Sequence, residues 1–226
     1  MDGRHPSAEV EERARQSAGG SNAAIYDMVR EALEVCGARG RRVVDVGCGT
    51  GRLSAYVKGR FDTYVGVDAV RYDGFPEDAA FHQCDLDGGR IPLEDAAADV
   101  VAAVEVIEHL ENPRALVREL ARVAAPGGWV VVTTPNQLSG LSLLTLLVKH
   151  RFSAFQDVHY PRHLTALLEV DLLRIARENG LTDVTCRYSL DGRIPLTAAH
   201  WPRTVSRCFP RTLSDNILMM GRKPAA

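Results

Sequence analysis

The sequence lacks a hydrophobic run long enough to cross a membrane. Its most apolar stretch, Leu138 to Val148, includes serines, a glycine and a threonine. It is also shorter than the roughly 20 apolar residues that a membrane-spanning helix needs. Residues 1–22 have no apolar core of the kind that marks a signal peptide. These absences predict a soluble protein of the cytoplasm with no transmembrane segment.

Cysteine pairs and a strong net charge are missing as well. The chain has five cysteines, an odd number with no CxxC pair, which argues against a zinc ribbon and a disulfide framework. The formal net charge at pH 7 is −2, so the chain has no overall basic field of the kind that nucleic-acid-binding proteins carry. We therefore expect reduced thiols, a small-molecule partner and no nucleic acid.

The glycine-rich segment VVDVGCGTG, residues 43–51, contains no lysine followed by serine or threonine. This absence excludes a phosphate-binding P-loop. The spacing Gly47-x-Gly49-x-Gly51 is also one residue shorter than the dinucleotide fingerprint, which disfavours a nicotinamide-dependent oxidoreductase. β-Branched residues before the glycines predict a strand. Glycine permits positive φ and close approach of a ligand to the backbone, so the turn predicts a nucleotide-like ligand.

Hydrophobic spacing along the rest of the chain predicts alternating helices and strands. Helices are expected at 8–17, 23–35, 53–57, 112–124 and 165–179. Strands are expected at 43–46, 63–70, 80–86, 129–135 and 215–224, and segment 99–110 is expected to begin as a strand and turn into a helix. Such alternation is typical of a parallel sheet with helices on both faces.

Acidic residues fall at the carboxyl ends of predicted strands. Parallel α/β sheets bind ligands at these ends, near the point where the strand order reverses. A carboxylate at Asp68 can accept hydrogen bonds from both hydroxyls of a ribose. Asp85 and Leu86 can flank an adenine. An acid-rich pocket suits a ligand with a positive centre better than a pyrophosphate. The residues expected to converge with the glycines are Asp45, Asp68, Asp85 and Glu105.

The ordered motifs VVDVGCGTG, VGVD, CDL, EVIEHL and PGGWVVVTTPN resemble those of class I S-adenosylmethionine-dependent methyltransferases. The resemblance spans about residues 40–136. It implies a Rossmann-like α/β fold with a seven-stranded, mostly parallel sheet, an antiparallel last strand supplied by NILMMGRKP, and helices on both faces. We expect one methyltransferase domain at 23–226, with insertions near 137–163 and 192–211, after an N-terminal segment 1–22 that can be mobile.

The same resemblance implies which residues surround the cofactor S-adenosylmethionine. Those expected at its methionine part are Asp45, Gly47, Cys48, Gly49 and Gly51. Those expected at its ribose and adenine are Asp68, Ala69, Asp85 and Leu86. Glu105 and Val106 are expected to line its other side.

Three histidines are candidate catalytic residues. Methyl transfer to oxygen or nitrogen can need a base whose pKa lies near the working pH, and histidine meets that requirement. His109 follows the fourth predicted strand, where acceptors meet the cofactor in this family, although a capping or core role is an equal alternative. His159 and His163 are four residues apart and share one face if their segment is helical.

A metal site is an alternative that we weigh at the same place. Glu105, Glu108 and His109 stand at i, i+3 and i+4, and with His159 or His163 they offer oxygen and nitrogen ligands. This set resembles the metal constellation of small-RNA 3′-end 2′-O-methyltransferases. The motif EVIEHL is also similar to metal-free small-molecule enzymes such as the ubiquinone-pathway O-methyltransferases, so we expect no metal.

The expected function is methyl transfer to oxygen or nitrogen of a small-molecule, glycan or lipid-linked acceptor. A metal-dependent RNA 2′-O-methyltransferase and a cofactor-binding scaffold without activity remain the alternatives. Segments 137–163 and 192–211 could cover the acceptor, lie on a membrane surface or form a dimer contact, and we interpret 137–163 as a mobile cover. The chain is expected to be a monomer or a homodimer.

Overall fold

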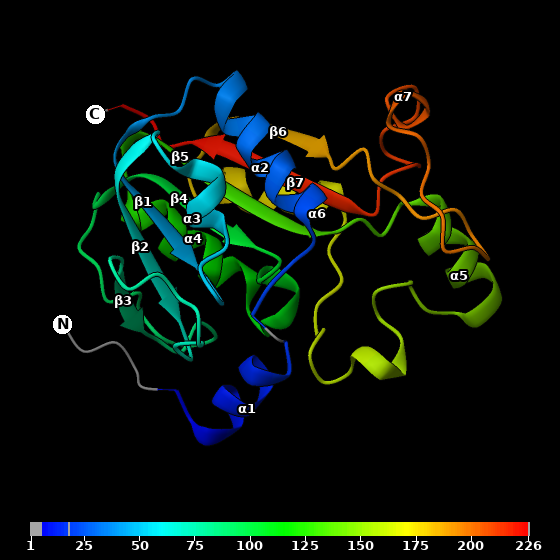
Figure 1. Cartoon of the computed structure of the whole chain (residues 1–226), viewed down its shortest axis with the longest axis horizontal. Coiled ribbons are helices and arrows are strands. Elements are labelled where there is room, and N and C mark those ends of the chain that lie inside the picture. The colour runs from blue at the N-terminus through cyan, green and yellow to red at the C-terminus, as the bar shows by residue number, and fades with distance from the viewer. Residues whose placement is uncertain (1–5, 18, 226) are drawn as a thin grey trace.

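A single seven-stranded sheet forms the centre of the computed structural model, which describes residues 6–17 and 19–225 (Figure 1). Its strand order is β3-β2-β1-β4-β5-β7-β6. The strands are β1 (Gly40–Val46), β2 (Phe61–Asp68), β3 (Ala80–Gln83), β4 (Ala98–Val104), β5 (Ala124–Pro135), β6 (Thr182–Tyr188) and β7 (Asn216–Arg222). Strand β7 is antiparallel to β5 and β6, while the pairs from β3 through β5 are parallel. The predicted fold class is confirmed.

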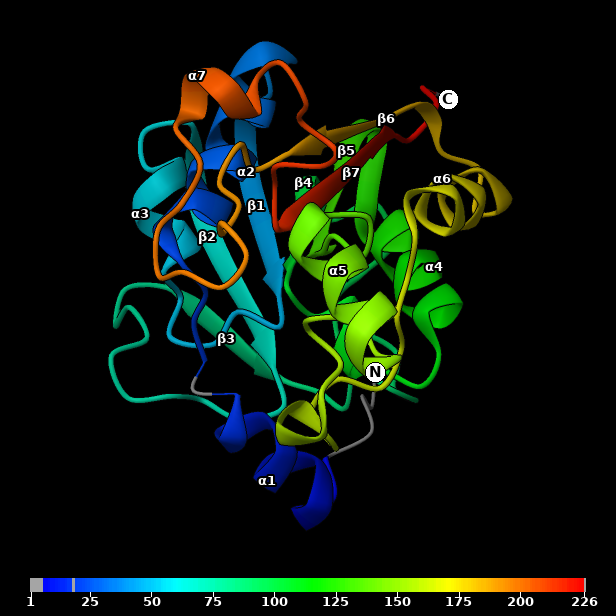
Figure 2. The same cartoon turned by 90° about the vertical axis from the view of Figure 1, so that its right-hand side faces the viewer.

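Helices cover both faces of the sheet, as the edge-on view in Figure 2 shows. Helices α4 (Pro113–Val123) and α6 (Glu169–Glu178) pack on one face, and α2 (Ala23–Val35) and α3 (Leu53–Val57) pack on the other. The remaining helices are α1 (Ala8–Gln16), η1 (Ile107–His109), α5 (Gly140–Lys149), η2 (Asp157–His159) and α7 (Arg203–Ser206). No helix in the described part of the chain has the length and apolar character that a membrane span requires.

The strand order reverses between β1 and β4. Strands β1, β2 and β3 follow one another toward one edge, and β4 then pairs with β1 on its opposite side. The carboxyl ends of β1 and β4 diverge from this point into separate turns, which leaves a crevice between them. The fold therefore places the ligand site above these two strands.

Several predicted elements differ from the structure at their ends. Helix α6 begins at Glu169 rather than at Thr165, because the N–H groups of Leu164 and Thr165 donate to the Glu108 carbonyl and hold this segment extended. The third strand ends at Gln83, before Asp85, which accepts a hydrogen bond from Gly89 N in a turn. Each difference comes from a hydrogen bond that helix or strand spacing does not encode.

Strand β6 was not predicted from the sequence. It lies at the edge of the sheet, where it pairs with β7 alone, and its side chains are exposed or only half-buried. An edge strand of this kind shows little of the hydrophobic alternation by which a strand is recognised. Its assignment therefore depends on the backbone pairing with β7.

The N-terminal segment and the two expected insertions are also structured. Helix α1 lies beyond the carboxyl ends of the strands (Figure 1), where Ala14 O accepts from the Tyr72 hydroxyl and Gln16 O accepts from Arg162. Residues 1–5 and 18, part of the segment expected to be mobile, lie outside the described residues. The insertions near 137–163 and 192–211 are joined where the first begins and the second ends: Gly140 N donates to the O of Thr212, just after the second, and Nδ2 of Asn136, just before the first, donates to Arg211 O.

Candidate functional site

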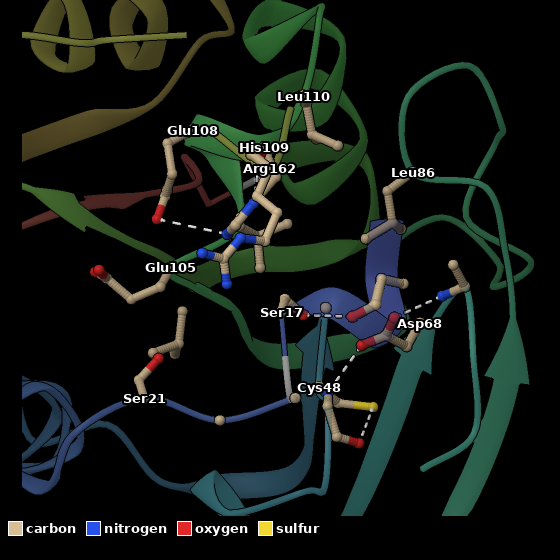
Figure 3. Close-up of a pocket in the computed structure, with 18 of the residues that line it drawn as sticks. Ser17, Ser21, Cys48, Asp68, Leu86, Glu105, Glu108, His109, Leu110 and Arg162 are labelled. Carbon is tan, nitrogen blue, oxygen red and sulfur yellow. Dashed lines mark hydrogen bonds and ion pairs between the residues drawn. The ribbon is translucent and has the colours of Figure 1, made fainter. Parts of the chain in front are cut away.

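A cavity of about 360 Å³ lies at the carboxyl ends of β1, β2 and β4, and Figure 3 shows part of its lining. Helix α1, η1 and residues 162–163 complete its walls. Its volume is within the range of small-molecule sites. Most residues predicted from the sequence line it, namely Asp45, Gly47, Cys48, Gly49, Asp68, Ala69, Asp85, Leu86, Glu105, Val106, His109 and His163. Gly51 and His159 are not among its lining residues.

The glycine turn fits tightly between its neighbours. Gly47 has φ +71°, and a Cβ there would lie 2.3 Å from Val106 Cγ2. Gly49 has φ +52°, and a Cβ there would lie 2.1 Å from Gly19 O. The turn thus needs glycine both for its backbone conformation and for space. Gly51 has φ +74° but faces Pro76, so it shapes the loop behind the cavity.

Asp68 holds the glycine turn in place. Its Oδ2 accepts from Gly49 N at 2.8 Å, and its Oδ1 accepts from Ala69 N at 2.7 Å. Burial raises the pKa of this carboxyl, while the backbone donors act in the opposite direction. Each carboxylate oxygen retains a second lone pair for a ligand. The sequence predicted the place of Asp68 in the cavity but not its bonds to the turn.

Asp45 brings a partly unpaired carboxyl group to the cavity. Its Oδ2 accepts from the Tyr64 hydroxyl at 2.5 Å, whereas its buried Oδ1 has no hydrogen-bond partner among the described residues. Burial, together with the charge of Asp68, raises the pKa of Asp45 to about 7. An unpaired buried carboxyl oxygen beside a glycine cradle suits a ligand that carries a cationic or hydrogen-bond-donating group.

Cys48 and Asp85 complete the side of the cavity that carries the glycine turn. Burial raises the pKa of the Cys48 thiol far above its usual value, so Cys48 remains a thiol and packs without acting as a nucleophile. Asp85 Oδ1 accepts from Asp87 N at 3.0 Å, which fixes the turn that carries Leu86 into the lining.

Glu105 sits at the end of β4 with φ +56°, an uncommon value for a residue other than glycine. Its Oε1 accepts from Thr133 Oγ1 at 2.8 Å, and its Oε2 accepts from Asn216 Nδ2 at 2.8 Å. Burial raises the pKa of Glu105 to about 7. Sequence reasoning missed Asn216, which comes from β7 at the far end of the chain and has no motif of its own.

Glu108, His109 and His163 form a cluster on the other side of the cavity from Asp68 and Leu86; Figure 3 labels Glu108 and His109. The ring centroids of His109 and His163 are 4.8 Å apart. His109 Nδ1 lies 2.7 Å from Arg162 O, and His163 Nδ1 lies 2.7 Å from Ala154 O. We name Glu108, His109 and His163 the histidine cluster.

Burial shifts the pKa values of the histidine cluster in the direction that favours the neutral form of each side chain. It lowers the pKa of His109, and together with the neighbouring His109 it lowers the pKa of His163 to about 4. Burial and the charge of Glu105 raise the pKa of Glu108. At pH 7 both imidazoles are therefore neutral and can accept a hydrogen bond.

His159 lies outside this cluster, although its ring stacks on that of His163 with a centroid distance of 5.4 Å. Its Nδ1 accepts from Gln156 N at 3.2 Å. The neutral ring must then carry its proton on Nε2, which makes that nitrogen a donor. Of the three predicted catalytic histidines, the structure brings His109 and His163 to the cavity and leaves His159 behind them.

The fold and the site define a Rossmann-like enzyme with a glycine cradle and acids for a cationic nucleoside ligand. Residues 18–186 match the family model described as a methyltransferase domain, and the chain belongs to this family. It is an S-adenosylmethionine-dependent methyltransferase, as the sequence motifs predicted. The unpaired Asp45 Oδ1 and the space left by Gly47 and Gly49 are compatible with that cofactor.

Curated relatives and solved structures agree with this assignment. The chain is 31% identical to a ubiquinone biosynthesis O-methyltransferase of Paracidovorax citrulli over 68% of this chain and 73% of the relative. It is 27% identical to one of Leptothrix cholodnii over 72% of each chain.

A SAM-dependent methyltransferase from Archaeoglobus fulgidus shares the fold with a TM-score of 0.63 and 19% identity, over 92% of this chain and 97% of that one. Phosphoethanolamine N-methyltransferase 2 of Haemonchus contortus, solved with S-adenosyl-L-methionine, has a TM-score of 0.56 and 16% identity, over 87% of this chain and 52% of that one.

We predict that Gly47→Ala destabilises the fold and abolishes cofactor binding. The added Cβ would overlap Val106 and the residue would keep a positive φ, a combination that costs about 2–4 kcal/mol of unfolding free energy. Gly59→Ala is the matched control, since Gly59 has φ +77° with nothing within 4 Å of the new Cβ. It should cost only about 1 kcal/mol. Urea denaturation and cofactor titration measure both effects, and equal losses in the two variants would contradict the steric argument.

Proposed function

We propose that this enzyme transfers the methyl group of S-adenosylmethionine to a hydroxyl oxygen of a small molecule. The observation that carries the proposal is the histidine cluster, which offers two neutral imidazoles and a buried carboxyl group at the side of the cavity away from Asp68. The names of the curated relatives support oxygen as the methylated atom. A hydroxyl needs such acceptors because it must lose its proton as it is methylated.

The proposed cofactor orientation follows the polar groups of the cavity. Asp45 Oδ1 would hold the ammonium of the methionine part, and the backbone of Gly47 and Gly49 would cradle that part. Asp68 would accept from the ribose hydroxyls through the lone pairs that its backbone donors leave free.

The rest of the lining completes this orientation. Asp85 and Leu86 would hold the adenine together with Ala69, and Glu105 and Val106 would line the opposite side of the cofactor. Held by these residues, the cofactor would leave the histidine cluster free to meet the acceptor.

Methyl transfer requires alignment more than it requires covalent chemistry by the protein. When bound, the cofactor would supply a methyl group for in-line displacement from sulfur by the acceptor oxygen, and the cavity walls would hold the two reactants together and exclude water. Helix α1 contributes to this enclosure through Val10, Arg13 and Ala14. The guanidinium of Arg162 lies in the same lining and favours a hydroxyl that becomes negative as it ionises.

We predict that Asp68→Ala weakens S-adenosylmethionine binding by about 1–3 kcal/mol, because the ribose loses charged acceptors and the glycine turn loses its anchor. Asp62→Ala is the matched control, since Asp62 lies at the exposed start of the same strand. Calorimetry should show a weakened affinity in the first variant only and no binding of NAD to the wild type. An unchanged affinity in Asp68→Ala would contradict the proposed ribose contact.

We predict a pH dependence that Asp45 generates. Its pKa in the folded protein, about 7, lies above its ordinary value of 3.8. The stabilisation from its native proton is therefore complete below the ordinary value, and it is lost as the pH rises through about 7. A cationic cofactor favours the ionised carboxylate, so its affinity should rise over the same interval, by at most about tenfold per pH unit.

Asp45→Asn isolates this effect from Asp68, Glu105 and Glu108, whose pKa values are raised in the same direction. The melting temperature of the cofactor-free protein and the cofactor affinity are measured from about pH 5 to about pH 8. Both should change less with pH in this variant than in the wild type. Identical pH profiles for the wild type and the variant would rule out Asp45 as their source.

The proposed reaction is tested by methyl transfer from labelled cofactor to paired acceptors that differ only in a hydroxyl or an amine. Free, glycan-linked and lipid-linked hydroxyl compounds form separate arms. We expect label on hydroxyl acceptors, and a decrease in kcat of about 100-fold or more in His109→Gln with unchanged cofactor affinity. His200→Gln, which alters an exposed histidine paired with Asp191, is the control. Label on amines alone would overturn the proposal.

A further inference from the structure

We propose that the acceptor carries an anionic carboxylate or phosphate group, and that the guanidinium of Arg162 binds this group while the acceptor hydroxyl meets the histidine cluster. The role of this contact in the reaction rests on the proposed function, whereas binding of the anion can be measured without turnover. Arg162 then determines which acceptors the enzyme takes, through their charge.

Arg162 brings a positive charge to the cavity from the segment between η2 and α6. Its side chain is half-buried and belongs to the cavity lining. Figure 3 shows the guanidinium beside the ring of His109. The carbonyl oxygen of Arg162 lies 2.7 Å from His109 Nδ1, so the backbone of this residue positions the imidazole while its side chain supplies the charge. An anion bound to Arg162 would therefore have a defined position relative to His109.

The guanidinium of Arg162 retains hydrogen-bond donors for a ligand. Nη1 donates to Gln16 O at 3.1 Å, and Nη2 donates to Val158 O at 3.3 Å. Both partners are neutral carbonyl groups, and no carboxylate of the described residues forms an ion pair with Arg162. Each terminal nitrogen has a second N–H, and Nε has one more. Such a planar set of donors binds a carboxylate or a phosphate through two parallel hydrogen bonds.

The charged groups near Arg162 leave its positive charge uncompensated. Arg13, the other arginine of the lining, has a partner, because its Nη2 lies 3.7 Å from Asp87 Oδ2. Burial raises the pKa of Glu108, which favours its neutral form. Glu105 directs both carboxyl oxygens to other donors. A cation in a half-buried site without a counter-ion favours an anionic ligand, because the low dielectric strengthens their attraction.

The histidine cluster can receive the hydroxyl of the same acceptor. A backbone carbonyl can only accept, so the bonds to Arg162 O and Ala154 O place a proton on Nδ1 of His109 and His163. Each neutral ring then has its lone pair on Nε2, which can take the proton of a hydroxyl. His159 has the opposite arrangement, with its proton on Nε2. An acceptor held by its anion at Arg162 and by its hydroxyl at His109 would be fixed at two points, which aligns it for methyl transfer.

Anion binding is tested on the full-length protein saturated with S-adenosylhomocysteine, the demethylated cofactor. Calorimetry measures the dissociation constants of benzoate and phenyl phosphate, with benzamide as the uncharged analogue of benzoate. We expect the wild type to bind one of the two anions about tenfold or more tightly than benzamide, because an ionised partner strengthens the hydrogen bonds of Arg162. Arg162→Gln should lose this preference. Whichever anion binds more tightly identifies the carboxylate or the phosphate as the group recognised.

Arg151→Gln is the matched control, since Arg151 is an exposed arginine earlier in the same segment and pairs with Asp157. It should bind all three compounds as the wild type does. Arg162 also contacts α1 through Gln16 O, and benzamide separates the two roles. Displacement of α1 would weaken benzamide and the anions equally, whereas loss of the anion contact weakens the anions alone. Thermal melting verifies that both variants fold.

Three results overturn the proposal. The first is equal affinity for the anions and benzamide in the wild type, or no measurable binding of any of them. The second is an unchanged preference for the anion in Arg162→Gln. The third is a loss of S-adenosylhomocysteine affinity of about tenfold or more in Arg162→Gln, because Arg162 would then bind the carboxylate of the cofactor's methionine part.

Turnover separates this proposal from the proposed function. Methyl transfer to 4-hydroxybenzoate should have a higher kcat/KM than transfer to 4-hydroxybenzamide in the wild type, and the two values should become similar in Arg162→Gln. Anion binding as expected without label on any hydroxyl acceptor supports the anion site and refutes the proposed function. Label on hydroxyl acceptors regardless of their charge supports the proposed function and overturns the role of Arg162 in choosing the acceptor.

Discussion

The pairing of β1 with β4 is the constraint on which the rest of the site depends. Val43, Val44 and Asp45 pair with Val100, Val101 and Ala102, so the turns that follow the two strands emerge side by side. The glycine turn then lies against Val106, and Gly47 is needed because the contact leaves no room for a side chain. The glycine turn on one side of the cavity and Glu105, Glu108 and His109 on the other take their positions from these two adjacent turns.

The cavity concentrates acidic groups that are expensive to ionise. Burial raises the pKa values of Asp45, Asp68, Glu105 and Glu108, and hydrogen bonds from Tyr64, Gly49, Thr133 and Thr134 offset part of that effect. Without a ligand, ionising these buried carboxyl groups costs free energy, and a positively charged ligand lowers that cost. A sulfonium cofactor with an ammonium group supplies that positive charge.

The sequence predicted the side of the cavity with the glycine turn better than the side with the histidine cluster. Asp45, the glycines and Asp68 occupy fixed places in strand–turn–helix units, so short motifs carry them. The side with the histidine cluster joins η1 to residues 154–163, which are distant in the sequence and have no regular periodicity. Sequence spacing alone grouped Glu105 with His109, and it made His159 and His163 equal candidates for catalysis. In the structure, the hydrogen bonds of these side chains distinguish Glu105 from His109 and His159 from His163.

By itself the sequence determined six of the seven strands, the helices that cover the sheet, the glycine turn and the acids at the strand ends, because local hydrophobic spacing and backbone preference encode these features. Only the tertiary structure decided which nitrogen of each histidine is free, that Asn216 and Thr133 bind Glu105, and that α1 closes the cavity. These features depend on contacts between residues far apart in the chain. A side chain's protonation and availability are set by the neighbours that the fold brings to it, and no local pattern records those neighbours.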